Sequence, residues 1–260
     1  MRLLTWNLWW RFGPWEERAG AIENVLATER ADVLFLQEVR TGDGQAEHLA
    51  DVLDLSAAVC DREQDMGNAI VSRWPIIESD VRHLPGSADR PSVRRALHAV
   101  LDSPWGPWPV VCTHLAHRFD ESALRLAQVD AVADLVAEIR PRHQLPVLLG
   151  GDFNAVPDSD EIRRLTGRTA VHRPDLVFAD MWELQGTGSG HTWSGSNPYL
   201  NDANWPNRRI DYLFVTWPRT KPAGHPRRVW LAGTEPVDGV QPSDHFAVVA
   251  EIATPTEDQK

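Results

Sequence analysis

Val147-Leu148-Leu149-Gly150-Gly151-Asp152-Phe153-Asn154 joins an apolar run to two glycines, an acid and an amide. Short apolar runs are typical of buried strands, and functional side chains tend to lie where such strands emerge into loops. Two glycines before an acid allow the backbone to approach a ligand closely. Asp152 and Asn154 face the same way if the segment is extended. The alternative is a turn built from the two polar side chains.

Polar residues flank several other apolar runs in the same way. They are Asn7 after 3–6, Glu38 after 33–37, His114 after 110–113, Asp211 within 209–215, and Asp244 with His245 before 246–249. Taken singly they are weak signals, since an Asn after a strand is usually a turn residue. Together, acids, amides and histidines at several strand ends are the material of a metal-assisted hydrolase site.

Two of these positions allow a sharper interpretation. Glu38 and Asn7 offer the hard oxygen ligands that Mg²⁺ prefers. Asp211 within a strand is costly unless it has a partner. The N–H of a histidine ring such as that of His245 is a good partner, and the carboxylate would fix the tautomer of that ring and raise its pKa. Pairing of Asp211 with Arg208 or Arg209 remains the alternative.

Strands and helices alternate along the chain and predict one layered α/β or α+β domain over 1–253, followed by a short polar tail over 254–260. We expect helices over 15–29, 44–53 and 121–140, and a short helix ending at Leu165 that a capping box of Asp158 and Glu161 opens. The expected strands cover 2–6, 32–36, 57–60, 69–72, 76–84, 95–101, 109–113, 147–149, 210–215, 229–232 and 246–252.

Composition limits the function. The 260 residues carry a net charge of −11, which argues against a non-specific nuclease that grips long nucleic acid through a basic surface. Cys60 and Cys112 lie in apolar stretches, and we expect buried free thiols. No stretch approaches the ~18 apolar residues of a membrane span, and the first residues lack the apolar region of a signal peptide. We therefore expect a cytoplasmic protein.

Six short motifs occur in a fixed order along almost the whole chain. They are Thr5-Trp6-Asn7, Gln37-Glu38-Val39, Thr113-His114-Leu115, Gly151-Asp152-Phe153-Asn154, Arg209-Ile210-Asp211-Tyr212 and Ser243-Asp244-His245. In this order they resemble the endonuclease/exonuclease/phosphatase superfamily, to which deoxyribonuclease I belongs. The resemblance implies an α+β fold, a four-layer α/β/β/α sandwich of two mostly antiparallel sheets flanked by helices.

The resemblance also implies roles for the strand-end residues. Mg²⁺ or Mn²⁺ would be bound by Glu38, with Asn7 and Asp244 nearby. Asp152 would activate or orient the attacking water, and Asn154 would stabilise the transition state. The scissile phosphate would contact His245, held by Asp211, and His114 on the opposite side. Asn68 and Arg95 match weaker family positions that help to bind phosphate. The implied reaction is hydrolysis of a phosphodiester or phosphomonoester by in-line attack of water.

The substrate stays open at this level. The acidic net charge favours a small or short phosphate ester. A nuclease or DNA-repair phosphodiesterase is the alternative, and it needs a basic rim for which Arg90, Arg94, Arg95, Arg118, Arg208 and Arg209 are candidates. A sphingomyelinase-like lipid phosphodiesterase and a non-catalytic binding module rank lower. The tryptophan-rich loops 9–15, 117–119 and 191–206 would shape specificity by stacking on a base or a lipid edge. The sequence makes no prediction about oligomeric state.

Overall fold

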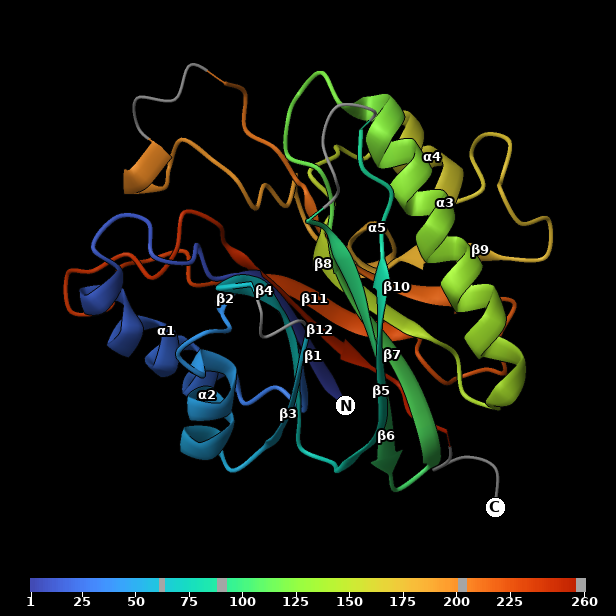
Figure 1. Cartoon of the computed structure of the whole chain (residues 1–260), viewed down its shortest axis with the longest axis horizontal. Coiled ribbons are helices and arrows are strands. Elements are labelled where there is room, and N and C mark those ends of the chain that lie inside the picture. Colours follow the sequence, from blue (N-terminus) through green and yellow to red (C-terminus); the bar gives the residue numbers. More distant parts are fainter. Residues whose placement is uncertain (61–63, 88–92, 201–204, 256–260) are drawn as a thin grey trace.

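The computed structural model describes residues 1–60, 64–87, 93–200 and 205–255. Arg90 and the end of the expected polar tail, 256–260, lie outside the described residues. Two six-stranded sheets pack face to face between two layers of helices (Figure 1). This arrangement confirms the α+β four-layer sandwich that the resemblance implied.

The first sheet has the strand order β11-β12-β1-β2-β4-β3. In this sheet β1 and β2 are parallel, and every other pair of neighbouring strands is antiparallel. Its strands are β1 (Arg2–Asn7), β2 (Val33–Arg40), β3 (Ser56–Val59), β4 (Met66–Ser72), β11 (Pro226–Ala232) and β12 (Ala247–Ile252).

The second sheet has the order β5-β6-β7-β8-β10-β9, with β7–β8 as its parallel pair. Its strands are β5 (Ile76–His83), β6 (Arg95–Ser103), β7 (Gly106–His114), β8 (Leu148–Asp152), β9 (Val177–Asp180) and β10 (Asp211–Trp217). Each sheet is therefore mostly antiparallel with one parallel pair among the described strands.

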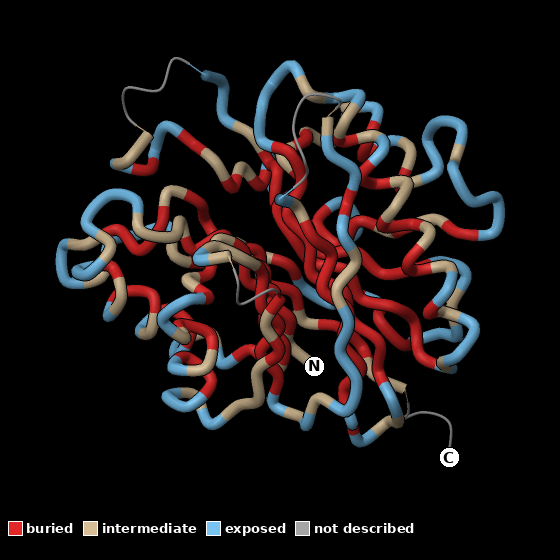
Figure 2. Tube along the Cα trace, viewed as in Figure 1, coloured by how far each residue is buried: buried red, intermediate tan, exposed pale blue. Residues whose placement is uncertain are grey.

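The helices cover the outer faces of the sheets. In Figure 1, α1 (Trp15–Glu29) and α2 (Gln45–Leu53) lie against the first sheet, while α3 (Ser122–Ile139) and α4 (Asp160–Leu165) lie against the second. The remaining helical segments are α5 (Met181–Gln185), η1 (Arg140–Arg142) and η2 (Pro198–Leu200). Three apolar cores result, one between the sheets and one under each helical layer, and Figure 2 shows burial concentrated along the strands.

Strand alternation determines which side chains face the space between the sheets. Leu3 of β1 packs in the central core, whereas Leu4 and Trp6 pack under α1 and α2. Because the side-chain period of a strand is two, Asn7 at the end of β1 shares the inward face of Leu3. The same phase places His114, Asp152 and Asp211 on the inward face, as continuations of Cys112, Leu148 and Leu213 in the central core.

Most predicted elements agree with the structure to within a few residues. The short strand β9, the helix α5 and the 3-10 segment η2 were not predicted. The expected capping box at α4 is wrong, because the N-cap is Ser159 and no side chain caps the helix. Glu161 instead turns inward and pairs with Arg125 at 2.9 Å, since a buried carboxylate needs a cationic or hydrogen-bonded partner.

Candidate active site

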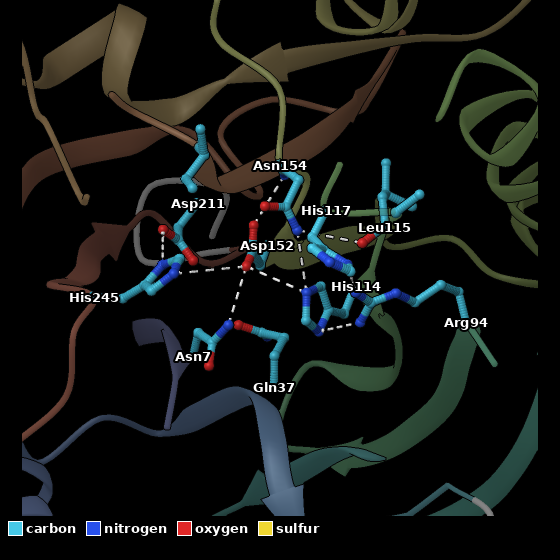
Figure 3. A network of polar contacts seen from close by, with 12 residues as sticks. Asn7, Gln37, Arg94, His114, Leu115, His117, Asp152, Asn154, Asp211 and His245 are labelled. Atoms are coloured by element: carbon cyan, nitrogen blue, oxygen red, sulfur yellow. Dashed lines mark hydrogen bonds and ion pairs between the residues drawn. The ribbon is translucent and has the colours of Figure 1, made fainter. Parts of the chain in front are cut away.

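Asp152 lies at the centre of the polar cluster (Figure 3). In the second sheet it stands in register between His114 of β7 and Asp211 of β10. Its Oδ2 accepts a hydrogen bond from the Asn7 amide across the two sheets at 3.0 Å. Burial raises the pKa of Asp152 to about 6, with the nearby Asp211 carboxylate adding to the shift, because both disfavour the charged form.

The segment after Asp152 is a turn, which is the alternative that the sequence left open. Asn154 has φ 50°, and its backbone N–H donates to Asp152 Oδ1 at 2.9 Å. The side-chain amide of Asn154 nevertheless reaches the cluster, where it lies 3.2 Å from His114 Nε2 and 3.3 Å from the Leu115 carbonyl oxygen. The turn therefore positions the side chain that the sequence singled out.

The two glycines before Asp152 serve packing rather than ligand approach, which corrects the sequence interpretation. A Cβ on Gly150 would stand 2.5 Å from the Phe35 ring of the other sheet. A Cβ on Gly151 would stand 2.1 Å from the Thr113 carbonyl oxygen of the neighbouring strand. Both positions face protein, so only glycine fits there.

His245 is fixed by Asp211. The Asp211 carboxylate lies 2.9 Å from His245 Nδ1, and Nε2 of the same ring is 4.0 Å from Asp152 Oδ2. Burial alone would lower the pKa of His245, but the carboxylates of Asp211 and Asp244 raise it well above its usual value. Asp211 thus fixes the ring through Nδ1, and Nε2 is directed toward Asp152.

Neither arginine considered as a partner of Asp211 pairs with it, since Arg208 lies over the Phe119 ring. Arg209 pairs with Asp180 at the end of β9 at 2.7 Å, and both side chains are buried.

His114 has the opposite character. A guanidinium N–H of Arg94 lies 2.8 Å from its Nδ1. A guanidinium only donates hydrogen bonds, so Nδ1 accepts and the ring proton lies on Nε2, 3.4 Å from Asp152 Oδ2. Burial and then the charge of Arg94 lower the pKa of His114 well below its usual value. His114 is therefore a neutral hydrogen-bond donor.

Glu38 reaches the site through a β-bulge. The register between β2 and β4 shifts between Leu36 and Val39, and Glu38 has φ 50°. A bulge redirects the side chain of the extra residue, and Glu38 lines the same cavity as His114 and Asp152. Its Oε2 is buried without a hydrogen-bond partner among the described residues, and burial raises its pKa.

The acid-rich surroundings of Glu38 fit a divalent cation. Asp244 lines the same cavity, and desolvation raises its pKa to about 6. A carboxylate oxygen left unpaired in a low-dielectric site is unfavourable, and a hard cation satisfies it. Asp152, Asp211 and His245 also bring ligand atoms within 4.8 Å of one another. These three buried residues therefore form a second group that could hold a cation.

A cavity of about 280 Å³ opens over these groups. The aromatic rings of Trp9, Phe12, Phe119 and Trp193 line it together with the catalytic candidates. We call these four residues the aromatic wall. Phe119 is 45% exposed and stacks on Trp205 with a ring separation of 4.3 Å. The wall therefore offers flat apolar surface next to the polar cluster.

The remaining candidates lie beside the main cavity. Asn68 and Arg95 line a neighbouring cavity that shares Glu38 and His114 with the first one. The Asn68 amide donates to the Arg95 carbonyl oxygen at 3.0 Å. Among the arginines considered for a basic rim, Arg208 lines the main cavity and lies over the Phe119 ring at 4.3 Å. Arg95 and Arg209 are buried, so no continuous basic rim forms among the described residues.

Two contributors were missed from the sequence. Arg94 appeared only as a rim candidate, whereas it sets the tautomer of His114. Gln37 was quoted only as part of a motif, whereas its buried amide donates to the Phe35 carbonyl at 2.9 Å and lies 3.3 Å from Cys112 Sγ. Both cysteines are buried and free, as expected.

Comparisons with known proteins agree with this geometry. The model of the Endonuclease/Exonuclease/phosphatase family matches residues 4–245. Tyrosyl-DNA phosphodiesterase 2 of Xenopus tropicalis is 27% identical over 261 residues, which cover 96% of this chain and 65% of that protein. Sphingomyelinase C of Listeria ivanovii is 24% identical over an alignment that covers 58% of this chain and 46% of that protein. The chain thus spans about two-thirds or less of these relatives.

Among solved structures, D. rerio TDP2 complexed with a single-strand DNA product superposes with a TM-score of 0.78 at 19% identity. The match covers 98% of this chain and 99% of that one. At this identity the likeness supports the fold alone. No helix in the described part of the chain is both long and apolar enough to cross a membrane.

Proposed function

This chain belongs to the endonuclease/exonuclease/phosphatase family, and from that premise we propose that it is a divalent-metal-dependent phosphodiesterase acting on short phosphodiesters. The observation that carries the proposal is the convergence of Asn7, His114, Asp152, Asp211 and His245 at one end of the core between the sheets, with the unpaired Glu38 Oε2 beside them. Two histidines, one hydrogen-bonded to Asp211 and the other to Arg94, flank one carboxylate in a buried site. This arrangement suits water activation and binding of non-bridging phosphate oxygens.

Each residue has a role in in-line attack. Asp152 accepts hydrogen bonds from Asn7 and the Asn154 backbone, and a carboxylate held in this way orients the attacking water and takes its proton. His245 donates Nε2–H as a cation to one phosphate oxygen while Asp211 keeps the ring charged and oriented. His114 and Asn154 donate as neutral groups on the opposite side.

Glu38, with Asn7 and Asp244, would hold Mg²⁺ or Mn²⁺. The cation would neutralise charge on the phosphoryl group and would lower the pKa of a bound water. Asn7 Oδ1 accepts a hydrogen bond from the Trp9 backbone N–H at 2.9 Å. The same oxygen has a second lone pair, which would be available to the cation. Titration with Mg²⁺ should raise the melting temperature of the wild type, and Glu38→Gln should abolish that rise.

Charge favours a diester over a monoester. The site gathers the carboxylates of Glu38, Asp152, Asp211 and Asp244 against the imidazolium of His245. A singly charged diester suffers less repulsion there than a doubly charged monoester. The Xenopus relative carries the name of a phosphodiesterase, which is in line with this choice.

The aromatic wall supports a substrate with a planar group beside the phosphate, such as a single-stranded nucleic-acid end or an aryl ester. Base–aromatic stacking is worth ~1–3 kcal/mol per base. A DNA-repair phosphodiesterase is the second candidate, supported by the relatives named tyrosyl-DNA phosphodiesterase. The net charge of −11 opposes tight binding of long duplexes. We also propose a cytoplasmic location, supported by the two buried free thiols and testable by cell fractionation.

Turnover of a substrate panel tests this function. Bis(4-nitrophenyl) phosphate, 4-nitrophenyl phosphate, single- and double-stranded oligonucleotides, inositol phosphates and sphingomyelin are compared with Mg²⁺ and Mn²⁺. We expect hydrolysis of the aryl diester and of single-stranded ends, with a weak dependence on salt.

Two variants and a control test the site. Asp152→Ala and His245→Ala should each lose about 10²–10⁴-fold in kcat, whereas Asp51→Asn on the exposed face of α2 should retain full activity. Retained activity in both site variants would contradict the site assignment. A steep loss of oligonucleotide affinity with salt would instead favour a nuclease of long chains.

A further inference from the structure

Arg18 is a charged side chain on the buried face of α1. It is 1% exposed and precedes Ile22 and Val25 at helical spacing, and both of these residues are buried too. Burying a guanidinium is costly unless hydrogen bonds or an opposite charge compensate. No ion pair with a carboxylate is formed by Arg18 in the described part of the chain. Its compensation therefore comes from other groups.

Backbone carbonyl groups supply that compensation. One terminal nitrogen of Arg18 donates to the carbonyl oxygens of Leu8 and Pro242, at 2.8 Å each. The other donates to the carbonyl oxygens of Trp9, Trp10 and Phe12, at 2.9, 3.0 and 3.0 Å. A single guanidinium thus forms hydrogen bonds with four residues of the turn over 8–12 and connects this turn to Pro242, in the segment before Asp244.

The turn that Arg18 holds has an unfavourable backbone conformation. Trp9 and Trp10 have φ 60° and 35°, in the left-handed region that residues other than glycine, asparagine and aspartate seldom adopt. Such a conformation persists only where the surroundings impose it. The guanidinium also lies 4.8 Å from the centre of the Trp9 ring. Arg18 therefore contacts both the backbone and one side chain of this turn.

The same turn forms one side of the candidate active site. Trp9 and Phe12 belong to the aromatic wall of the cavity. The Trp9 ring also packs on Tyr199 at 4.6 Å, and the Tyr199 hydroxyl donates to the Gln241 carbonyl oxygen at 3.0 Å. Tyr199 thus links the loop of Trp9 to the loop of Gln241, and Arg18 donates hydrogen bonds to both of these loops.

We propose that Arg18 is a positioning residue that fixes the Trp9–Phe12 side of the aromatic wall and thereby sets the affinity for the planar group beside the scissile phosphate. Among the described residues, no hydrogen bond or ion pair joins Arg18 to Glu38, Asp152 or His245, and its charge acts on Asp244 and Glu38 only from a distance. The inference rests on the proposed phosphodiesterase function and adds to it a residue that governs substrate affinity.

The chemistry of the side chain explains why arginine is needed here. The planar guanidinium directs donors in fixed directions, and two of its nitrogens serve five carbonyl groups. Lysine has one ammonium nitrogen with three donors, so it can replace only part of the set. Methionine fills a similar volume and donates nothing.

Steady-state kinetics with two ligands test the proposal at saturating Mg²⁺. Bis(4-nitrophenyl) phosphate reaches both the phosphate site and the wall, whereas inorganic phosphate, measured as an inhibitor, reaches the phosphate site alone. For Arg18→Met we expect KM for the diester to rise at least 10-fold. We expect kcat and the inhibition constant of phosphate to stay within 3-fold. Arg18→Lys should fall between this variant and the wild type.

A double-mutant cycle tests whether Arg18 acts through the wall. Trp9→Ala alone should raise KM similarly, and combining it with Arg18→Met should add little further, because coupled residues are non-additive. Leu26→Ala, on the same buried face of α1, is the control for loss of stability and should leave KM unchanged. Equal rises in KM and in the phosphate inhibition constant, additive effects in the cycle, or an unchanged KM would each overturn the proposal.

Hydrogen exchange separates this inference from the proposed activity, because it requires no turnover. Peptides that cover 8–12 and 238–245 should exchange at least 10-fold faster in Arg18→Lys than in the wild type. In the control Leu26→Ala, exchange should not be accelerated selectively in these peptides. If the wild type hydrolyses no ester but this exchange pattern holds, the proposed function fails and the tethering of the turn stands. Unchanged exchange in these peptides refutes the tethering itself.

Discussion

Alanine substitutions at the two glycines before Asp152 should reduce stability, because both positions pack against protein. At Gly151 the added methyl carbon would stand 2.1 Å from the Thr113 carbonyl oxygen. Backbone cannot rotate away as a side chain can, so β7 and β8 must separate by roughly 1 Å to restore an ordinary contact. The move stretches neighbouring ladder hydrogen bonds, which are each worth ~0.5–1.5 kcal/mol.

Overpacking itself costs ~1–3 kcal/mol. For Gly151→Ala we therefore expect a loss of about 3 kcal/mol in the free energy of unfolding, or a melting temperature ~6–12 °C lower. His114 and Asp152 form the next register pair along the same two strands. A displacement of about 1 Å there should lower kcat/KM by roughly 10²-fold.

Gly150→Ala should behave differently, because its methyl carbon meets the Phe35 ring at 2.5 Å in the core between the sheets. We expect a loss of ~1–3 kcal/mol in stability and a kcat/KM close to that of the wild type. Gly20→Ala in α1 is the matched control. No atom lies within 4 Å of its added carbon, and the change should stabilise the helix by ~0.5–1 kcal/mol.

Urea denaturation followed by Trp fluorescence, together with diester turnover, measures both quantities on the same samples. The packing interpretation predicts that Gly151→Ala loses stability and activity together. If this variant keeps the stability of the wild type and loses only substrate affinity, the glycine serves approach to the ligand and the reasoning is wrong.

Three further perturbations have distinct expected outcomes. Asp211→Asn should lower kcat by about 10–100-fold with a small change in KM, because a buried charged hydrogen bond of ~1.5–3 kcal/mol holds His245; an unchanged kcat would exclude this role. Glu161→Gln should destabilise the fold by about 3–5 kcal/mol in urea denaturation, since it leaves the buried charge of Arg125 unpaired. The control is Glu138→Gln, which removes the exposed ion pair of Glu138 with Arg82 and should change stability by less than ~1 kcal/mol. Burial lowers the pKa of His98 to about 4 from an ordinary 6.5. Between pH 6.5 and pH 4 the unfolded chain therefore binds a proton at His98 and the folded chain does not, so stability falls as the pH decreases. His98→Asn should therefore lose less stability than the wild type between pH 6.5 and pH 4, by ~1–2 kcal/mol, when melting temperature is followed against pH. Parallel curves of melting temperature against pH for the two proteins would contradict the shift in pKa.

The sequence predicted the inward members of the site where strand alternation alone determines them. Asn7 continues the inward face of Leu3, and Asp152 continues that of Leu148. A period of two and the position of the strand end were enough for these residues. Glu38 is different, because strict alternation would place it on the outer face with Leu34 and Leu36. Only the bulge with its left-handed φ brings it inward, and a one-residue bulge leaves no periodic trace.

The partner of Asp211 could not be chosen from the sequence for a similar reason. Arg209 and His245 were both plausible partners. Arg209 is taken by Asp180, and Asp180 ends β9, a strand of four residues that was not predicted. With Arg209 occupied there, His245 is the group that meets Asp211. The sequence showed neither β9 nor the pairing of Arg209 with Asp180, so it could not exclude Arg209 as the partner of Asp211.

The two sides of the cavity mouth are supported by the outer helices rather than by the strands that carry the chemistry. Arg125 of α3 is buried and donates to the Ala116 and Arg118 carbonyl oxygens, which hold the loop leading to Phe119. Arg18 of α1 does the same for the loop of Trp9. Strand ends carry the proposed catalytic residues in a fixed register, whereas one buried arginine on α1 and one on α3 each hold a loop of the wall. Changes in these loops can therefore alter the substrate while the register of His114, Asp152 and Asp211 stays intact, and this separates the residues of the reaction from those of specificity.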